Sequence, residues 1–169
     1  IGLDYFSHDT DMYEDPKVKF LKAKYKLLGY GFYGRLLEIV YKEKGYFAEF
    51  TERHIVIFSD ETGLTFEQCN EMLNVCLDED LFDKNLYQKY AILTSKRIQR
   101  NYLKGCEKRK SIQLNENYLL INPLEVIGEK FKGRFDVLPD NSVINSQNSG
   151  INSINDGINP QRIEENRIE

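Results

Sequence analysis

Three consecutive seven-residue units near the C-terminus limit how much of this 169-residue chain can fold around a core. The units NSVINSQ, NSGINSI and NDGINPQ fill residues 141–161. Most of their positions hold Asn, Ser, Gly or Pro, and the few isoleucines cannot form a coiled-coil seam. So little apolar surface cannot offset the entropy lost on ordering the chain. We therefore expect residues 1–138 to form one domain and residues 139–169 to be a disordered, Asn-rich linker or tail.

Helical periodicity dominates the first part of the domain. Pro16 follows a capping aspartate, and apolar residues then recur at spacings of three and four, so a helix is predicted from Pro16 to about Leu28, where Gly29 stops it. A second helix is predicted from there to Gly45. Its apolar face would consist of Tyr33, Leu36, Leu37, Val40 and Tyr41.

The middle of the domain reads as a strand and two more helices. Residues 46–50 are aromatic and favour a strand. Thr51 can cap a third helix that ends near Gly63, and Thr65 with Gln68 forms a capping-box pattern for a fourth. The fourth helix would bury a face that includes Cys69 and Cys76.

The order of the remaining segments predicts the fold class. Residues 81–87 and 90–95 look like two short strands joined by a turn, residues 96–110 like a helix, and residues 118–122 like a further strand. A helix pair followed by a hairpin is the winged form of helix-turn-helix. We therefore predict an α+β, winged-helix-like helical domain with a small β-hairpin.

Composition bears on membrane association and on the cellular compartment. No apolar run approaches the roughly 18 residues needed to cross a bilayer, so no membrane association is expected. The three cysteines, Cys69, Cys76 and Cys106, form no C-x-x-C pair. An odd set of this kind is typical of reduced thiols, and the expected location is the cytoplasm.

A basic segment is the strongest functional signal. Residues 96–110 hold seven cations and one acidic residue, in a chain whose net charge is −4. On a helix five of the cations, Lys96, Arg97, Arg100, Lys104 and Lys108, share one stripe, while Ile98, Tyr102 and Cys106 face the other way. The stripe could lie along phosphates, with Gln99 and Asn101 at its flanks. The candidate DNA-binding residues are Lys96, Arg97, Arg100, Asn101, Lys104, Lys108, Arg109 and Lys110. The other interpretation of the stripe is a solvated amphipathic helix.

Two further charged faces bear on DNA binding. Lys19, Lys22 and Lys26 give the first helix a smaller basic strip. The fourth helix exposes Glu67, Glu71, Asp78 and Glu79, with no cation to offset them, and this face would repel a phosphate backbone. It is a better candidate for a protein partner or a second copy of the chain.

Two other patterns give weaker indications of a ligand site. GYGFYG, residues 29–34, matches G-x-G-x-x-G but follows a lysine-rich helical segment, whereas a dinucleotide site needs a buried strand before it. We read it as a helix junction and expect no cofactor. Asp4, His8, Asp9 and Asp11 could hold a divalent ion, but acidic residues before a helix more often cap it, so no metal and no catalytic residue is expected.

Several stretches together resemble one protein family. Residues 2–9 (GLDYFSHD), 14–47, 81–102 (which end in AILTSKRIQRNY) and 104–110 are similar to the N-terminal domain of phage and prophage replisome organisers, itself similar to the DnaD-like winged-helix domain. The resemblance implies a role in DNA replication initiation without catalysis. The expected partners are DNA of the replication origin, further copies of the chain, and helicase-loading proteins of the host or phage.

Two alternatives stay open at this point. The domain could be an oligomerisation and protein-interaction scaffold, with DNA binding supplied by a C-terminal domain that these 169 residues lack. A metal-dependent nuclease built on Asp4, His8, Asp9 and Asp11 is the second alternative.

Overall fold

A computed structural model describes residues 2–128, 133 and 135–138, all within the unit Ile1–Leu138. The Asn-rich segment 139–169, for which disorder is predicted, lies outside these described residues.

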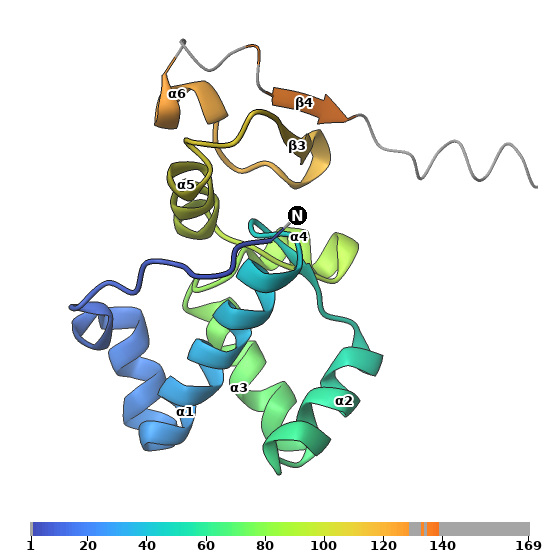
Figure 1. Cartoon of the computed structure of the whole chain (residues 1–169). Helices are drawn as coiled ribbons and strands as arrows, with labels where there is room; N and C mark the ends of the chain where they lie inside the picture. Colours follow the sequence, from blue (N-terminus) through green and yellow to red (C-terminus); the bar gives the residue numbers. More distant parts are fainter. Residues whose placement is uncertain (1, 129–132, 134, 139–169) are drawn as a thin grey trace, which may run out of the picture. The chain divides into compact units, whose positions relative to one another are not determined.

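The first two predicted helices form a helical pair with a sharp break between them. A short 3-10 helix, η1 (Met12–Glu14), leads into α1 (Pro16–Glu43), whose first turn is capped by the Asp15 side chain at 2.9 Å from the backbone N–H of Lys17. The chain reverses direction inside α1 (Figure 1), where Lys26 takes φ 59° and ψ −145°. The prediction that Gly29 stops the first helix is therefore wrong by three residues.

Gly29 has a packing role in place of the predicted stop. A Cβ at this position would lie 2.9 Å from the carbonyl oxygen of Leu21 and 3.0 Å from the Cβ of Tyr25. The missing side chain thus lets the second half of α1 approach the first half closely. GYGFYG itself lies within the second half of α1, so the junction predicted there is at Lys26 instead, and only the close packing at Gly29 is as expected.

The next elements follow the predicted capping signals. Strand β1 (Ala48–Glu49) precedes α2 (Glu52–Thr62) and α3 (Phe66–Asp78). The backbone N–H of Thr51 donates to Nδ1 of His54 at 3.2 Å, and Gly63 ends α2 at φ 70°. Thr65 and Gln68 form the predicted capping box, with distances of 3.0 and 3.2 Å.

The predicted hairpin at residues 81–95 is not formed, because its first strand is a helix. The side chain of Asp83 accepts from the backbone N–H of Leu86 at 2.8 Å and starts α4 (Lys84–Tyr90), which Ala91 ends at φ 52°. Strand β2 (Ile92–Leu93) pairs with β1 instead, antiparallel, with Leu93 opposite Ala48. The predicted order of elements holds as far as α3, but α4 takes the place of the first hairpin strand, and without this wing the winged-helix arrangement stays a prediction.

The last described elements cover the far side of a fifth helix. Helix α5 (Lys96–Gly105) is followed by β3 (Ile112–Asn115), η2 (Glu116–Tyr118), α6 (Pro123–Ile127) and β4 (Phe135–Leu138). β3 and β4 pair in parallel. The prediction of a strand at residues 118–122 is wrong, because Asn122 caps α6 with a side-chain bond to the N–H of Leu124 at 3.1 Å. The domain is mostly helical and of the α+β class.

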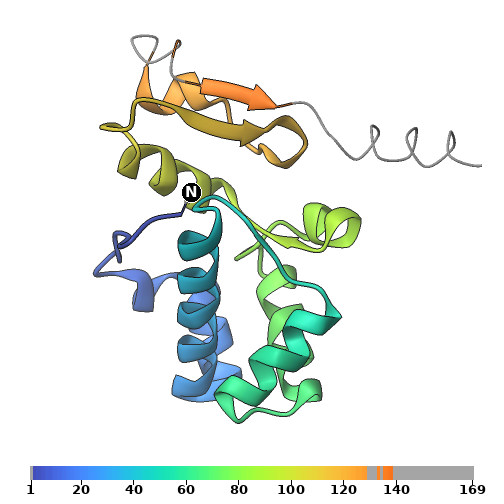
Figure 2. The same ribbon diagram turned by 45° about the vertical axis from the view of Figure 1, so that its right-hand side comes forward.

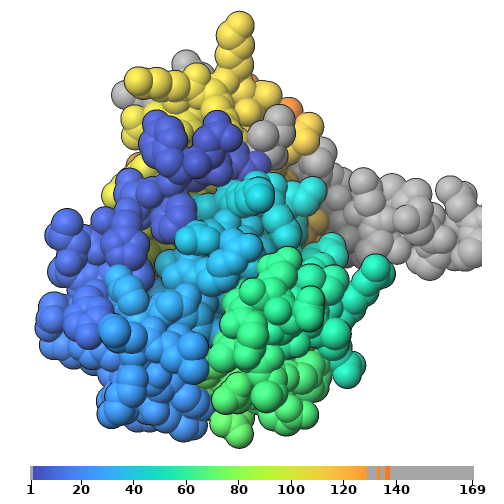
Figure 3. Space-filling view, turned by 60° about the horizontal axis from the view of Figure 1, so that its bottom comes forward, coloured from blue at the N-terminus to red at the C-terminus, as the bar shows by residue number. Residues whose placement is uncertain are grey.

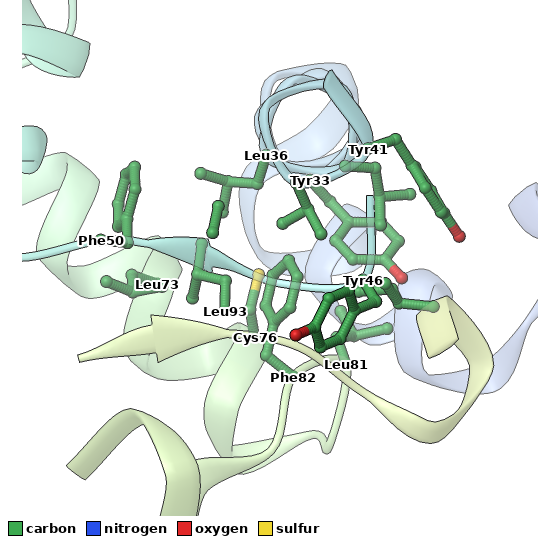
Figure 4. Close-up of a cluster of buried hydrophobic side chains, with 14 of the residues drawn as sticks. Tyr33, Leu36, Tyr41, Tyr46, Phe50, Leu73, Cys76, Leu81, Phe82 and Leu93 are labelled. Atoms are coloured by element: carbon green, nitrogen blue, oxygen red, sulfur yellow. The ribbon is translucent and has the colours of Figure 1, made fainter. Parts of the chain in front are cut away.

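The core joins α1, α3 and the β1–β2 pair. Figure 4 shows side chains from these elements in contact, among them Leu36, Leu73 and Leu93. Tyr33 meets Phe82 edge to face, with ring centroids 5.6 Å apart. The apolar face predicted for residues 33–41 is buried, and so are all three cysteines, which are free thiols. In Figure 2, α5 lies between this helical core and the β3–β4 pair, so it is covered on two sides.

Among the described residues, no helix combines the length and the apolar character that crossing a membrane requires.

Candidate nucleic-acid interface

Helix α5 is held in place by its apolar side. The Ser95 side chain accepts from the backbone N–H of Ile98 at 3.3 Å and starts the helix. Ile98, Tyr102 and Cys106 are buried, which confirms the predicted apolar face, and Leu103 is buried as well. Since both packed sides are fixed to the domain, the remaining side of the helix is presented rigidly to solvent.

Three cations line that exposed side. Lys96, Arg100 and Lys104 follow each other at intervals of four residues, and we refer to them as the α5 cation row. The helix itself contains no acidic residue, and no ion pair involves the row within the part of the chain that the structure describes. A rise of about 1.5 Å per residue spreads the row over roughly 12 Å.

Arg97 differs from the row because its charge is used within the domain. Its guanidinium bonds to the carboxylates of Asp9 and of Asp15, the latter at 3.1 Å. The hydrogen bond with Asp9 raises the pKa of Arg97 above its usual value. Figure 3 shows the N-terminal segment lying between α1 and the region of α5.

The N-terminal segment makes further contacts that occupy predicted DNA-binding residues. Arg109 donates to the carbonyl oxygen of Gly2 at 2.6 Å and lies 5.8 Å from the centre of the Tyr102 ring. Asn101 is half-buried and bonds to the Tyr41 hydroxyl. Arg109 therefore helps to seat the N-terminal segment and Asn101 is directed towards α1, so both are poorly placed to face a ligand.

The rest of the predicted stripe does not lie on the helix. α5 ends at Gly105, so Lys108, Arg109 and Lys110 lie in the turn that follows, and the prediction of a helix to residue 110 is wrong. Lys108 and Lys110 are exposed and extend the basic surface beyond the helix end.

Gln99 is not at the surface, contrary to the prediction that it flanks the stripe. It is completely buried, and its amide donates to Thr94 Oγ1 at 3.0 Å and to the Tyr118 carbonyl oxygen at 2.7 Å. Its carbonyl accepts from the N–H of Leu120 at 2.9 Å. Gln99 thus joins α5 to the chain that follows β3, and cannot contact bases.

A cleft of about 480 Å³ adjoins the row at the start of α5. Lys96, Arg97 and Arg100 contribute to its wall, but so do three aspartates. One of these, Asp80, lies 3.7 Å from the Lys17 ammonium. Because its opposite charges largely offset each other, the cleft is no simple anion pocket, and the row carries most of the uncompensated positive charge.

The other charged faces are more neutral than predicted. On α1, Lys19 bonds to Glu14 at 2.6 Å, and the Lys22 ammonium lies 3.4 Å from the centre of the Tyr13 ring. As predicted, α3 has no cation of its own, but Lys84 of α4 bonds to Asp78 at 2.7 Å and offsets one of the four acidic residues.

The aspartates and histidine of the N-terminus do not form a metal centre. His8 is bonded to the Tyr30 hydroxyl at 3.0 Å, and Asp9 is bonded to Arg97. In the described part of the chain no three potential ligands of this kind gather around one point. The metal-dependent nuclease therefore has no structural support here.

Burial around the site predicts instability at alkaline pH. Burial raises the pKa of the Tyr41 hydroxyl from 10.0 to about 12, partly countered by the bond from Asn101, and raises the pKa of the Cys76 thiol from 9.0 to about 12. The folded state holds these protons more tightly than the unfolded chain, so stability present below pH 9 is lost as the pH rises towards 12. Urea unfolding followed by circular dichroism should show an unfolding free energy that falls steadily above about pH 9. A constant value up to pH 11 would contradict the burial of these groups.

Together, the fold and the site define a small, mostly helical α+β domain with a rigidly held basic helix. The chain belongs to the Lin1244/Lin1753-like family, since residues 5–98 match the family's N-terminal domain. It is 30% identical over 126 residues to an uncharacterized phage-related protein, Lin1244/Lin1753, of Listeria innocua serovar 6a. The match covers 75% of this chain and 41% of that relative. No solved structure matches the chain.

Proposed function

We propose that this domain binds DNA and self-associates as part of a phage-type replication initiation protein. The observation that carries the proposal is the α5 cation row, three cations that form no ion pair with any described residue, on a helix whose other sides are fixed to the core. The match to a phage-related relative in the same family supports the proposal that the protein is of phage type. The expected partners are origin DNA and helicase-loading proteins, in the cytoplasm of a bacterial host.

The spacing of the row suits a nucleic-acid backbone. One strand of duplex DNA places a phosphate at about every 3.4 Å of helix axis, so a row of roughly 12 Å runs past three or four phosphates. Contacts of this kind position a protein on DNA without reading its sequence. The proposed DNA contact is therefore a backbone contact, made by Lys96, Arg100 and Lys104 and extended by Lys108 and Lys110.

The proposal is tested by replacing the row and measuring DNA binding against salt. The chain with Lys96→Ala, Arg100→Ala and Lys104→Ala should bind a labelled duplex at least tenfold more weakly at low salt. The slope of log affinity against log salt should flatten by about 2 to 3, since each phosphate contact contributes about 0.9. Fluorescence anisotropy between about 50 and 200 mM salt gives both values.

Two control variants test whether the DNA contact is made by α5. Lys22→Ala with Lys24→Ala removes two cations from α1 and should leave the salt slope nearly unchanged. Arg97→Ala should disturb the N-terminal segment more than DNA affinity, because Arg97 is already paired with Asp9 and Asp15. An intact chain that binds neither duplex nor single-stranded DNA at low salt would refute the proposal, and an equal loss in the α1 variant would refute the assignment to α5.

A protein-interaction scaffold is the second candidate function. The acidic face of α3 favours it, because Glu67 and Glu71 are exposed there and would repel DNA. Under this alternative the row variants would leave DNA binding absent or unchanged, while a protein partner would be lost when Glu67 and Glu71 are replaced by lysine.

A further inference from the structure

The outer face of α2 is apolar where a helix surface is usually polar. Ile55 and Phe58 point into the core and are buried. Val56 and Ile57 are nonetheless 53% and 48% exposed, side by side at the middle of the helix. Figure 1 shows α2 at the edge of the helical part, with α3 between it and the first half of α1.

Opposite charges flank this apolar pair. Arg53 lies one turn before it and Asp60 one turn after it, and both are exposed. Neither takes part in an ion pair within the described residues. At about 100° per residue, Arg53, Val56, Ile57 and Asp60 fall within an arc of roughly 100°. They form a single face, which we name the α2 face.

The order of residues on the α2 face is self-complementary. If two copies of α2 run antiparallel about a twofold axis at their midpoints, position 56 of one copy lies level with position 57 of the other along the helix axis, and position 53 level with position 60. Apolar groups then meet apolar groups, and each Arg53 meets an aspartate. In a twofold-symmetric dimer the same face of both copies meets itself, so that face must be complementary to itself. A face that binds an unrelated protein need not be.

The charges at the edges of the α2 face do not oppose this pairing. Glu52 and Glu61 lie on opposite flanks of the helix, about 180° apart, so a twofold axis keeps them away from each other. Glu61 is also held within its own chain by Arg35 at 3.6 Å. Beside Ile57 the surface continues into a groove of about 370 Å³, lined by apolar residues such as Ile39 and Phe58 and also by the charged residues Arg35, Lys42, Glu43 and Glu61. A second copy packed on α2 would cover more apolar surface than the two exposed side chains alone.

We infer that the α2 face is the interface through which two copies of this chain associate, with Val56 and Ile57 at its centre and two Arg53–Asp60 ion pairs around them. This inference rests on the self-association in the proposed function and not on its DNA binding. It names the surface, the symmetry and the residues that determine the pairing.

Charge exchange across the twofold axis tests the inference sharply. Sedimentation equilibrium on the 169-residue chain should show a monomer–dimer equilibrium. Arg53→Asp alone and Asp60→Arg alone should each raise the dimer dissociation constant at least tenfold, because each places like charges opposite one another. The double variant should recover the original value within about threefold, and an equimolar mixture of the two single variants should form heterodimers.

An apolar substitution gives an independent readout. Ile57→Glu should also raise the dissociation constant at least tenfold, whereas Leu27→Glu, at a residue 69% exposed on α1, should not. Circular dichroism would verify that each variant is folded. A chain that is monomeric at every concentration, or dimers unaffected by these α2 variants, would overturn the inference. DNA titration of the same variants remains a separate measurement, so failure of this interface is distinguishable from failure of the DNA proposal.

Discussion

Replacing Gly45 by alanine is expected to lower the free energy of unfolding by about 3 kcal/mol, from backbone strain and overpacking together. Gly45 has φ 86°, which L-residues rarely adopt, and its N–H closes the end of α1 on the Val40 carbonyl at 2.9 Å. A Cβ would lie only 2.2 Å from Cε2 of Tyr102. That ring is 2% exposed and cannot move aside. Chemical denaturation measures the loss directly.

Two other glycines separate the causes of this loss. Gly63 has φ 70° but open space around it, so Gly63→Ala should cost only about 1 kcal/mol from the backbone alone. Gly31 is helical and uncrowded, and Gly31→Ala should be neutral or slightly stabilising. If Gly45→Ala lowers the free energy of unfolding no more than Gly63→Ala does, Tyr102 does not lie as close to the end of α1 as the structure places it.

Replacing Gln99 by leucine is expected to cost about 3 kcal/mol as well, by removing hydrogen bonds and not by creating space. The substitution leaves the Leu120 N–H and the Tyr118 carbonyl without the partner they have at 2.9 and 2.7 Å. Both bonds are partly buried, and a polar group that loses its partner away from water costs about 1 to 3 kcal/mol. Thr94 Oγ1 still donates to the Tyr46 carbonyl at 2.6 Å, so that part of the network survives.

Gln88→Leu is the matched control, since Gln88 is exposed on α4 and the same substitution there should change stability little. The Gln99 variant also separates two roles for this residue. A structural role predicts lost stability with DNA affinity per folded molecule retained. Weaker DNA binding by a variant of unchanged stability would show that Gln99 faces the ligand after all.

The helices that sequence predicts best are those with both a periodic apolar face and a capping signal. α3 is capped by Thr65 and buries Cys69 and Cys76 as expected, because periodicity and cap agree there. α4 was missed because it has no buried residue inside its seven and therefore no apolar period. Only Asp83, as a capping side chain, could have indicated a helix start at that point.

The candidate site could be predicted in part. Exposure of Lys96, Arg100 and Lys104 follows from the amphipathic pattern of α5, since the opposite face must be buried. The pairing of Arg97 with Asp9 joins residues far apart in the chain, and no local pattern carries that information. Gln99 was misplaced for a similar reason. A second layer, formed by residues after β3, covers the side of α5 on which it lies.

The pairing of β1 with β2 has a consequence for the order in which the chain folds. The two strands bring residues 48 and 93 together, while α2 and α3 between them are joined by a turn and begin with capping signals of their own. Closing a loop of that length costs entropy before any contact repays it, whereas the α2–α3 unit needs only local contacts. We expect the helical hairpin to form first and to bring the strands within reach of each other, with α5 docking after them.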